Sequence, residues 1–263
     1  ICSQDMASMG VSSSANRIVR PSGARTSNFN QSNGLRANAI FSTIFGKPCA
    51  AGRNGVASKT AVSERQQGML ARLVGIVEPE GAEELARSLL QRFGSLGSVL
   101  SAPTSSITGL IGNSDAAALL SMVKVTVLEG LREDIRRQVF DLSDPNFINY
   151  IVGLMQGQLE ERLHAVFLDN SGRYLGDELI AEGTWSEISL KLRPLLRRAM
   201  EVNCAELILF HNHPSGDCRP SRIDVEFTLR AREIIHALGI NLSDHLVVSG
   251  TSVFSMRKAG LLT

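Results

Sequence analysis

The spacing of apolar residues changes at Gly157, and this change constrains the fold more than any other feature of the sequence. From Glu64 to about Phe140, apolar side chains recur every three or four residues, which predicts amphipathic helices. After Gly157, short apolar runs end at polar turns and alternate with helical segments. The pattern therefore predicts a small all-helical module followed by an α/β (α+β) domain, in which a mixed β-sheet is flanked by helices.

We expect three domains or segments: a tail over residues 1–63, a helical module over 64–140 and the α/β domain over 141–263. The first helix should bury a stripe of five apolar residues: Met69, Leu70, Leu73, Ile76 and Val77. A second helix should end at Gly94, and a third should begin behind Ser114. In the α/β domain we expect one more helix, then strands and helices in alternation: a helix over about 147–155, strands over 163–168, 174–184, 205–210 and 245–249, and helices over 186–202 and 222–238.

Residues 1–63 are rich in Ser, Gly, Asn and Ala and have little apolar periodicity, which is typical of a disordered tail. They contain seven Lys and Arg residues and a single acid, Asp5, a composition that also occurs in organellar transit peptides. Because the formal net charge of the whole chain is only +1, the remainder is mildly acidic. Surfaces that bind DNA usually carry a basic surplus, so this balance gives no general support for nucleic-acid binding.

Composition argues against two further classes, membrane proteins and disulfide-stapled secreted proteins. The longest apolar runs have about six residues, whereas a membrane-spanning helix needs about 20. The four cysteines, Cys2, Cys49, Cys204 and Cys218, form neither a disulfide framework nor a CxxC motif. We therefore expect a cytoplasmic protein without a membrane partner, and we expect Cys204 in the core.

The residues that carry chemistry lie in the stretch 211–224, which reads HNHPSGDCRPSRID. His211 and His213 are two residues apart at the end of a predicted strand, so their side chains point to one face, with backbones about 7 Å apart. A Pro/Gly turn follows, and Asp224 then falls in the first turn of the next helix. Two imidazoles, one carboxylate and an open position predict a catalytic zinc site.

A simpler reading exists for part of this stretch. Ser221-x-x-Asp224 has the spacing of a helix-capping box, with Asp in place of the usual Glu. The cap does not account for the paired histidines, and a cap and a metal site are compatible. Of the other histidines, His164 and His236 are expected to be surface or partly buried residues without chemistry, and His245 is expected to be structural.

The spacing from His211 to Asp224 resembles the JAMM (MPN+) signature of zinc-dependent isopeptidases. More closely, HNHPSGD followed by PSRID is similar to the RadC family of bacterial proteins, long labelled DNA repair proteins. The resemblance covers roughly residues 64–263 and includes the segments LDNSGRYLGDELIAEGT, DHLVVSG and ELARSLLQRFGSLGSVLSAP. It implies a JAB1/MPN fold, similar to that of cytidine deaminases, and a Zn²⁺ cofactor.

The resemblance also implies roles for residues outside the metal ligands. By position, Glu161 matches the glutamate that serves as general base in this mechanism, and Glu182 is the reserve candidate. Ser221 would donate a hydrogen bond to the oxyanion. Apart from the resemblance, two residues of the turn are candidates by their position alone: Asp217 for a substitute ligand or a partner that orients an imidazole, and Cys218 for a fourth ligand that would silence the site.

The family's helical region often carries a glycine-rich hairpin that contacts DNA phosphates. The corresponding segment here reads LIGNSDAA, which lacks the second glycine and the lysine and adds an acid, Asp115. We therefore interpret residues 64–140 as a packing module, with DNA a weakly supported partner. The main hypothesis is a JAMM-type metallohydrolase acting on peptide or protein substrates. The alternatives are a DNA-repair accessory protein whose zinc domain binds or scaffolds without turnover and a zinc-stabilised binding module. The sequence gives no oligomeric state.

Overall fold

The structure, a computed structural model, describes residues 59–183 and 188–262. Most of the expected tail over residues 1–63 lies outside the described residues. Its last five residues are the start of helix α2 (Lys59–Val74). Because α2 ends at Val74, the expected apolar stripe is only partly correct: Ile76 and Val77 lie in the following turn and are exposed.

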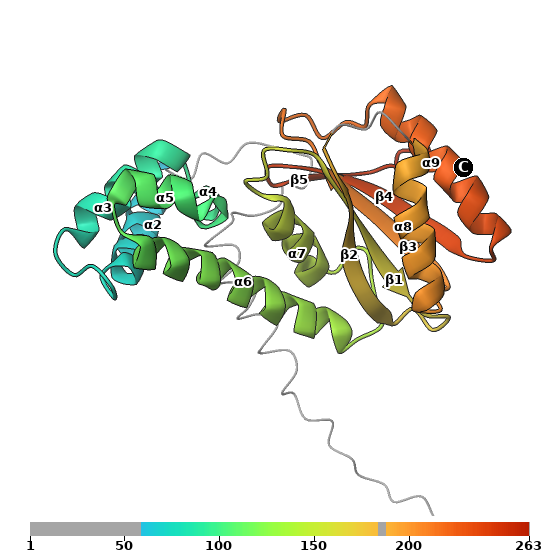
Figure 1. The fold of residues 1–263 in the computed structure, drawn as a ribbon, viewed down its shortest axis with the longest axis horizontal. Helices are drawn as coiled ribbons and strands as arrows, with labels where there is room; N and C mark the ends of the chain where they lie inside the picture. Colours follow the sequence, from blue (N-terminus) through green and yellow to red (C-terminus); the bar gives the residue numbers. More distant parts are fainter. Residues whose placement is uncertain (1–58, 184–187, 263) are drawn as a thin grey trace, which may run out of the picture.

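The helical module continues with four more helices: α3 (Ala82–Phe93), α4 (Leu96–Ser101), α5 (Thr104–Ile111) and α6 (Ser114–Arg136). Figure 1 shows them as a bundle from which α6 runs toward the sheet. Helix α3 ends as predicted, at Gly94, whose φ of 84° lies in the left-handed region that glycine tolerates. Helices α4 and α5 were not predicted, because six and eight residues are too few to show a clear helical repeat.

The second part contains a mixed β-sheet, as predicted, and the sheet has five strands. Its strands are β1 (Arg162–Leu168), β2 (Tyr174–Glu182), β3 (Glu206–Asn212), β4 (Asn241–Ser249) and β5 (Ser252–Ser255). Their order across the sheet is β2-β1-β3-β4-β5, and only β3 and β4 are parallel. Strand β5 was not expected, and β4 begins four residues before the predicted His245.

Helices cover both faces of this sheet. Helix α7 (Pro145–Met155) packs on one face, and α8 (Ile188–Glu201) and α9 (Arg222–Ala237) pack on the other. Alternate residues of each strand therefore enter two different cores. In β3, for example, Ile208 and Phe210 face the α7 side, whereas Leu207 and Leu209 face α8 and α9. This alternation also decides which side chains reach the candidate site.

The core on the α7 side continues into the helical module. It contains buried residues of α2 to α7 together with Val166, Ile208 and Leu246 of the sheet. The predicted boundary at residues 140–141 falls in the connection between α6 and α7, and these two helices pack against each other. His164, expected to be a surface or partly buried residue, is 8% exposed and stacks on Phe210 in this core.

Gly157 lies where the helical spacing of the sequence ends. Its φ is 79°, and a Cβ atom at this position would collide with the Cβ of Ser101 in α4. Glycine therefore lets the chain leave α7 close to the helical module and enter β1. This path sets the position of Glu161, which immediately precedes β1.

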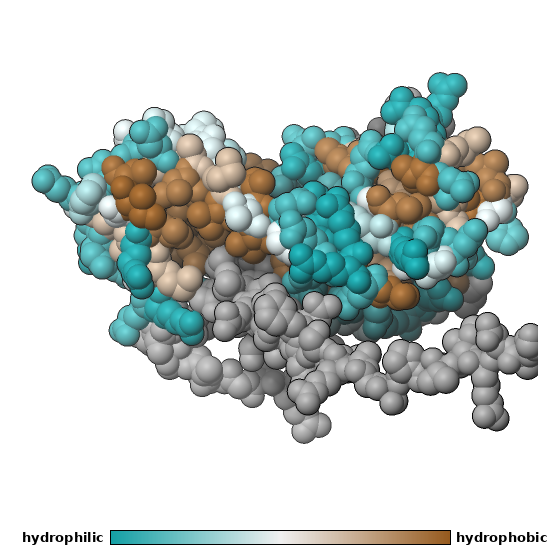
Figure 2. Space-filling view, turned by 90° about the horizontal axis from the view of Figure 1, so that it is seen from below, coloured by the Kyte–Doolittle hydropathy of each residue, from teal (hydrophilic) through white to brown (hydrophobic). Residues whose placement is uncertain are grey.

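Apolar surface is unevenly distributed. Figure 2 shows a continuous hydrophobic area on the helical module, whereas the hydrophobic areas of the sheet domain on the same face are separated by hydrophilic residues. The exposed apolar side chains of α6 include Met122 and Val125, which are 61% and 56% exposed. Within residues 59–183 and 188–262, no helix has both the length and the apolar character needed to cross a membrane.

Candidate metal centre

The histidines of the site come from the end of β3. His211 is the sixth residue of this strand, on the face that carries Leu207 and Leu209, and it is fully buried. His213 follows the strand directly, where its backbone N–H donates to Val248 in β4. The turn after it contains Gly216 at φ 96°, and it leads to α9 on the same face of the sheet.

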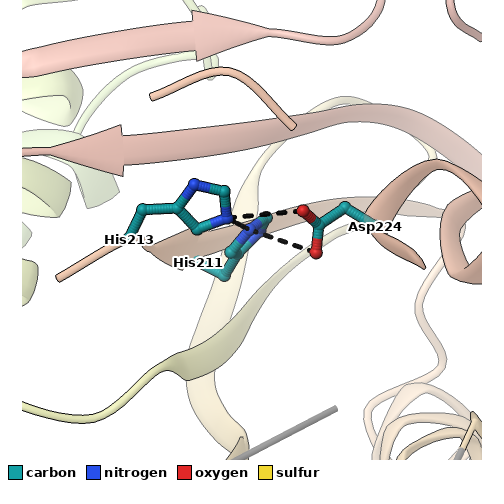
Figure 3. Close-up of side chains that lie close together, drawn as sticks. All are labelled: His211, His213 and Asp224. Atoms are coloured by element: carbon teal, nitrogen blue, oxygen red, sulfur yellow. Dashed lines mark hydrogen bonds and ion pairs between the residues drawn. The ribbon is translucent and has the colours of Figure 1, made fainter. Parts of the chain in front are cut away.

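Three predicted ligands meet at this point, as Figure 3 shows. The Nε2 atoms of His211 and His213 are 2.9 Å apart. The Asp224 carboxylate faces both rings, with Oδ1 3.5 Å from His211 Nε2 and Oδ2 3.3 Å from His213 Nε2. One ligand atom from each residue lies within 4.8 Å of the others. Two imidazole nitrogens and one carboxylate oxygen directed at a common point fit the donor set of a zinc ion.

The electrostatics of the group also favour a cation. Asp224 is 2% exposed, and burial alone would raise the pKa of its carboxyl. The hydrogen bond to His213, the electrostatic interaction with His211 and the hydrogen bonds from Ser221 outweigh that effect and hold the pKa below its usual range. In turn, the hydrogen bond to Asp224 raises the pKa of His213. A buried carboxylate that stays ionised beside two imidazoles supplies the negative charge a divalent ion needs.

Ser221 forms the predicted capping box with Asp224. Its Oγ accepts from the Asp224 N–H at 3.2 Å, and its own N–H donates to Asp224 Oδ2 at 2.6 Å. The box therefore fixes the carboxylate that faces the histidines, so cap and site coincide. The side-chain hydrogen bond of Ser221 to this carboxylate also helps to keep the pKa of Asp224 low.

Glu161 lies beside this group, at the level of His213. The pairing of β1 with β3 ends with Leu163 opposite His211, and Glu161 precedes Leu163 by two residues. Continuation of this register would set Glu161 opposite His213, with its side chain on the face of the two histidines. Its negative charge contributes to the raised pKa of His213.

Glu182, the reserve candidate, is placed differently. It pairs with Arg162 in the sheet, and the carboxylate of Glu182 accepts from the Arg162 guanidinium at 2.5 and 2.8 Å. Arg162 alternates with Leu163 and therefore belongs to the opposite face from His211. The geometry favours Glu161 over Glu182.

Comparison with known proteins agrees with this architecture. Residues 143–261 match the family model described as RadC-like JAB domain. A UPF0758 protein of Rhodobacter capsulatus is 34% identical over 184 residues, which cover 70% of this chain and 86% of that protein. A UPF0758 protein of Pseudomonas savastanoi pv. phaseolicola is 33% identical over 192 residues, covering 71% and 84%. A third, from Ruegeria pomeroyi, is 33% identical over 185 residues, covering 70% and 82%.

The chain belongs to the RadC family. The resemblance found in the sequence is confirmed, and so is the JAB-type fold that it implied. The matched region begins just before α7, so this helix belongs to the RadC-like JAB domain rather than to the helical module. The names of the relatives assign no activity.

Two further candidates lie in the turn of this RadC-family site. Asp217 does orient an imidazole, but through its backbone: its carbonyl oxygen accepts from His213 Nδ1 at 2.8 Å, while its carboxylate binds Arg219. Among the described residues, the candidate metal group consists of His211, His213 and Asp224, and Cys218 is not part of it. Cys204 is buried, as predicted.

The segment that corresponds to the RadC-family hairpin is the turn between α5 and α6. Gly112 ends α5 at φ 72°, and the Asn113 side chain accepts from the Ala116 N–H at 2.8 Å and donates to Glu78 at 2.8 Å. One backbone donor at the start of α6 is therefore already satisfied within the protein. The interpretation of this turn as a packing element stays a prediction.

The sequence interpretation expected a structural role for His245 but missed its contact with His211. This residue is fully buried within β4, and its Nε2 lies 2.8 Å from His211 Nδ1. Burial lowers its pKa to about 4. The one available signal was a histidine directly before the apolar run 246–248, and it became informative only with the pairing of Leu209 and His245 between β3 and β4.

Proposed function

We propose that this RadC-family protein is a zinc-dependent hydrolase of the JAMM type that cleaves peptide or isopeptide bonds. The observation that carries the proposal is the convergence of His211, His213 and Asp224 with Glu161 held beside them. When bound, zinc would act as a Lewis acid that activates water and polarises the substrate carbonyl. The residues of the chain supply the remaining parts of the reaction.

Glu161 is the general base in this proposal. From its place beside His213 it would take the proton of the attacking water and return it to the leaving amine. Asn212 holds this residue through the backbone: it accepts from the Arg162 N–H at 2.7 Å and donates to the Glu160 carbonyl at 2.9 Å. The carboxylate would thus be positioned by the residue that separates the two histidines.

Ser221 would stabilise the negative charge that develops on the carbonyl oxygen. Its backbone and its hydroxyl oxygen are fixed by the capping box, so the hydroxyl is anchored beside the ligands. One such donor typically contributes about 10² to 10³ in turnover.

A groove beside the site fits an extended substrate. It has a volume of about 580 Å³, and the proposed general base is one of its lining residues. Its lining residues are Leu159, Glu160, Glu161, Gly183, Pro214 and Ser215. An exposed groove suits a peptide segment or a flexible isopeptide linkage better than it suits a small buried metabolite.

Metal analysis and matched variants test this function. Purified protein should contain about one zinc per chain, and the double variant His211→Ala/His213→Ala should contain none. Glu161→Gln should keep the metal but lose cleavage of a peptide and isopeptide probe library scored by mass spectrometry, whereas Glu182→Gln should cleave normally. Equal loss in both glutamate variants would contradict the assignment of the base. A zinc-loaded wild type that cleaves no probe would favour the DNA-repair accessory hypothesis instead.

A further inference from the structure

His245 lies beneath the candidate metal centre and connects it to helix α9. It is fully buried, and each of its two ring nitrogens contacts one neighbouring side chain. Nε2 is 2.8 Å from His211 Nδ1, and Nδ1 is 2.6 Å from Thr228 Oγ1. Thr228 is also fully buried, one helical turn after Asp224. His245 and Thr228 therefore connect two of the three candidate ligands, His211 and Asp224, on the side away from the candidate metal position.

The hydrogen positions in this group follow from Thr228. Its Oγ1 lies 2.5 Å from the backbone carbonyl oxygen of Asp224, and a carbonyl oxygen can only accept. Two oxygens this close share a hydrogen, so the single hydroxyl hydrogen of Thr228 is used in that bond. Toward His245 the hydroxyl can only accept, and His245 Nδ1 must carry the proton.

The same reasoning extends to His211. The ring contacts of His245 are an imidazole and a hydroxyl, neither of which brings a compensating negative charge, so the fully buried ring is neutral. A neutral imidazole protonated at Nδ1 has a lone pair at Nε2. His245 Nε2 therefore accepts from the N–H at His211 Nδ1, which leaves the lone pair of His211 on Nε2, directed at His213 and Asp224.

We propose that His245 and Thr228 are positioning residues that fix the tautomer and ring orientation of His211 and thereby set the affinity of the site for a divalent cation. The inference rests on the metal site of the proposed function. His213 has its own orienting partner, the Asp217 carbonyl, so both imidazoles are held at Nδ1 and present Nε2. Loss of such partners typically weakens metal binding about 10- to 100-fold.

Zinc affinity, measured by competition with a chromophoric chelator, tests the proposal. His245→Phe keeps an aromatic ring but cannot accept from His211, and Thr228→Val keeps the shape but loses the hydroxyl. Each should raise the zinc Kd about 10- to 100-fold. His245→Gln and Thr228→Ser, which keep an acceptor at the required position, should recover most of the affinity. His164→Phe is the matched control, because it removes a buried imidazole from the opposite face of the sheet.

A second measurement is independent of metal. Nitrogen-15 NMR of the imidazoles in zinc-free protein should show His211 protonated at Nδ1 and His245 protonated at Nδ1. Two results would overturn this inference and leave the proposed function intact. One is the opposite tautomer of His211, and the other is wild-type zinc affinity in both His245→Phe and Thr228→Val. A wild type that binds no zinc would overturn this inference and the proposed function together. Should His245→Phe fail to fold, Thr228→Val and the tautomer measurement decide.

Discussion

Asn212 holds the backbone on both sides of Glu161. Its side-chain amide accepts from the N–H of Arg162 and donates to the carbonyl of Glu160, at 2.7 and 2.9 Å. These are the two residues that flank Glu161 in the chain. The middle residue of His-Asn-His therefore connects the histidines of β3 with the start of β1, although its own side chain points to the other face of the sheet.

Replacement of Asn212 should separate positioning from metal binding. In Asn212→Ala both bonds are lost, and a displacement of about 1 Å at Glu161 can lower turnover about 100-fold. The zinc content should stay at the wild-type level, because no ligand is touched. Turnover and metal analysis of the same preparation check this. Asn146→Ala, which removes another buried amide from α7, is the control and should leave turnover unchanged. Normal turnover in Asn212→Ala would contradict the positioning role.

Ser221 has two roles that substitution can distinguish. Glycine is nearly as good as serine at a helix N-cap, so Ser221→Gly should lower the free energy of unfolding by only a few tenths of a kcal/mol. It removes the hydroxyl, and turnover should fall about 10² to 10³. Ser221→Thr, which keeps both the cap and the hydroxyl, is the control. Steady-state kinetics measures the change in turnover, and urea denaturation measures the change in stability. A Ser221→Gly protein with the wild-type kcat would show that Ser221 acts only as a helix cap.

The metal ligands could be predicted from sequence because they are local. Strand alternation puts His211 and His213 on one face, and a short turn returns the chain to Asp224, all within one stretch of 14 residues. The capping pattern located the start of α9 for the same reason. The type and order of most helices and strands followed from periodicity in a similar way.

His245 could not be found by that reasoning. It is 34 residues from His211, and the two meet only because β3 and β4 are parallel neighbours in a particular register. The sequence does not specify that register. Likewise, His213 is held by the carbonyl of Asp217 and not by its side chain, and a backbone contact of this kind leaves no mark on residue type.

His164 should make stability depend on pH. Burial lowers the pKa of this histidine to about 4, whereas an unfolded histidine titrates near 6.5. Between these values the unfolded chain binds a proton that the folded chain does not, so stability is full above about pH 6.5 and falls toward pH 4. The loss would reach about 3 kcal/mol at pH 4.

The variant His164→Phe isolates this effect. Phenylalanine keeps the stacking on Phe210 but has no proton to bind. Urea denaturation of both proteins at pH 7.5, 6, 5 and 4.5 should show the wild type losing stability relative to the variant as the pH falls. A stability difference that is the same at every pH would rule out His164 as the titrating group.

Asp177 should be a main stabilising link between α6, α7 and the sheet. Its side chain is 4% exposed and accepts from Arg132 of α6 at 3.2 Å and from Tyr150 of α7 at 2.8 Å. It also accepts a hydrogen bond from Tyr174. Removal of one partner from a buried ion pair leaves the other unpaired, so Asp177→Ala should lower the free energy of unfolding by about 3 to 5 kcal/mol.

Glu129 provides the matched control for this last prediction, because it binds the same guanidinium of Arg132 at 2.7 Å from a position that is 46% exposed. Exposed ion pairs contribute about 0 to 1 kcal/mol, so Glu129→Ala should be nearly neutral. Since neither residue touches the metal group, both variants should bind zinc like the wild type when folded. Urea denaturation measures the difference. Equal destabilisation by Asp177→Ala and Glu129→Ala would contradict the prediction, because burial would then not strengthen the contacts of Asp177. The junction of α6, α7 and the sheet would in that case be stabilised by the shared apolar core alone.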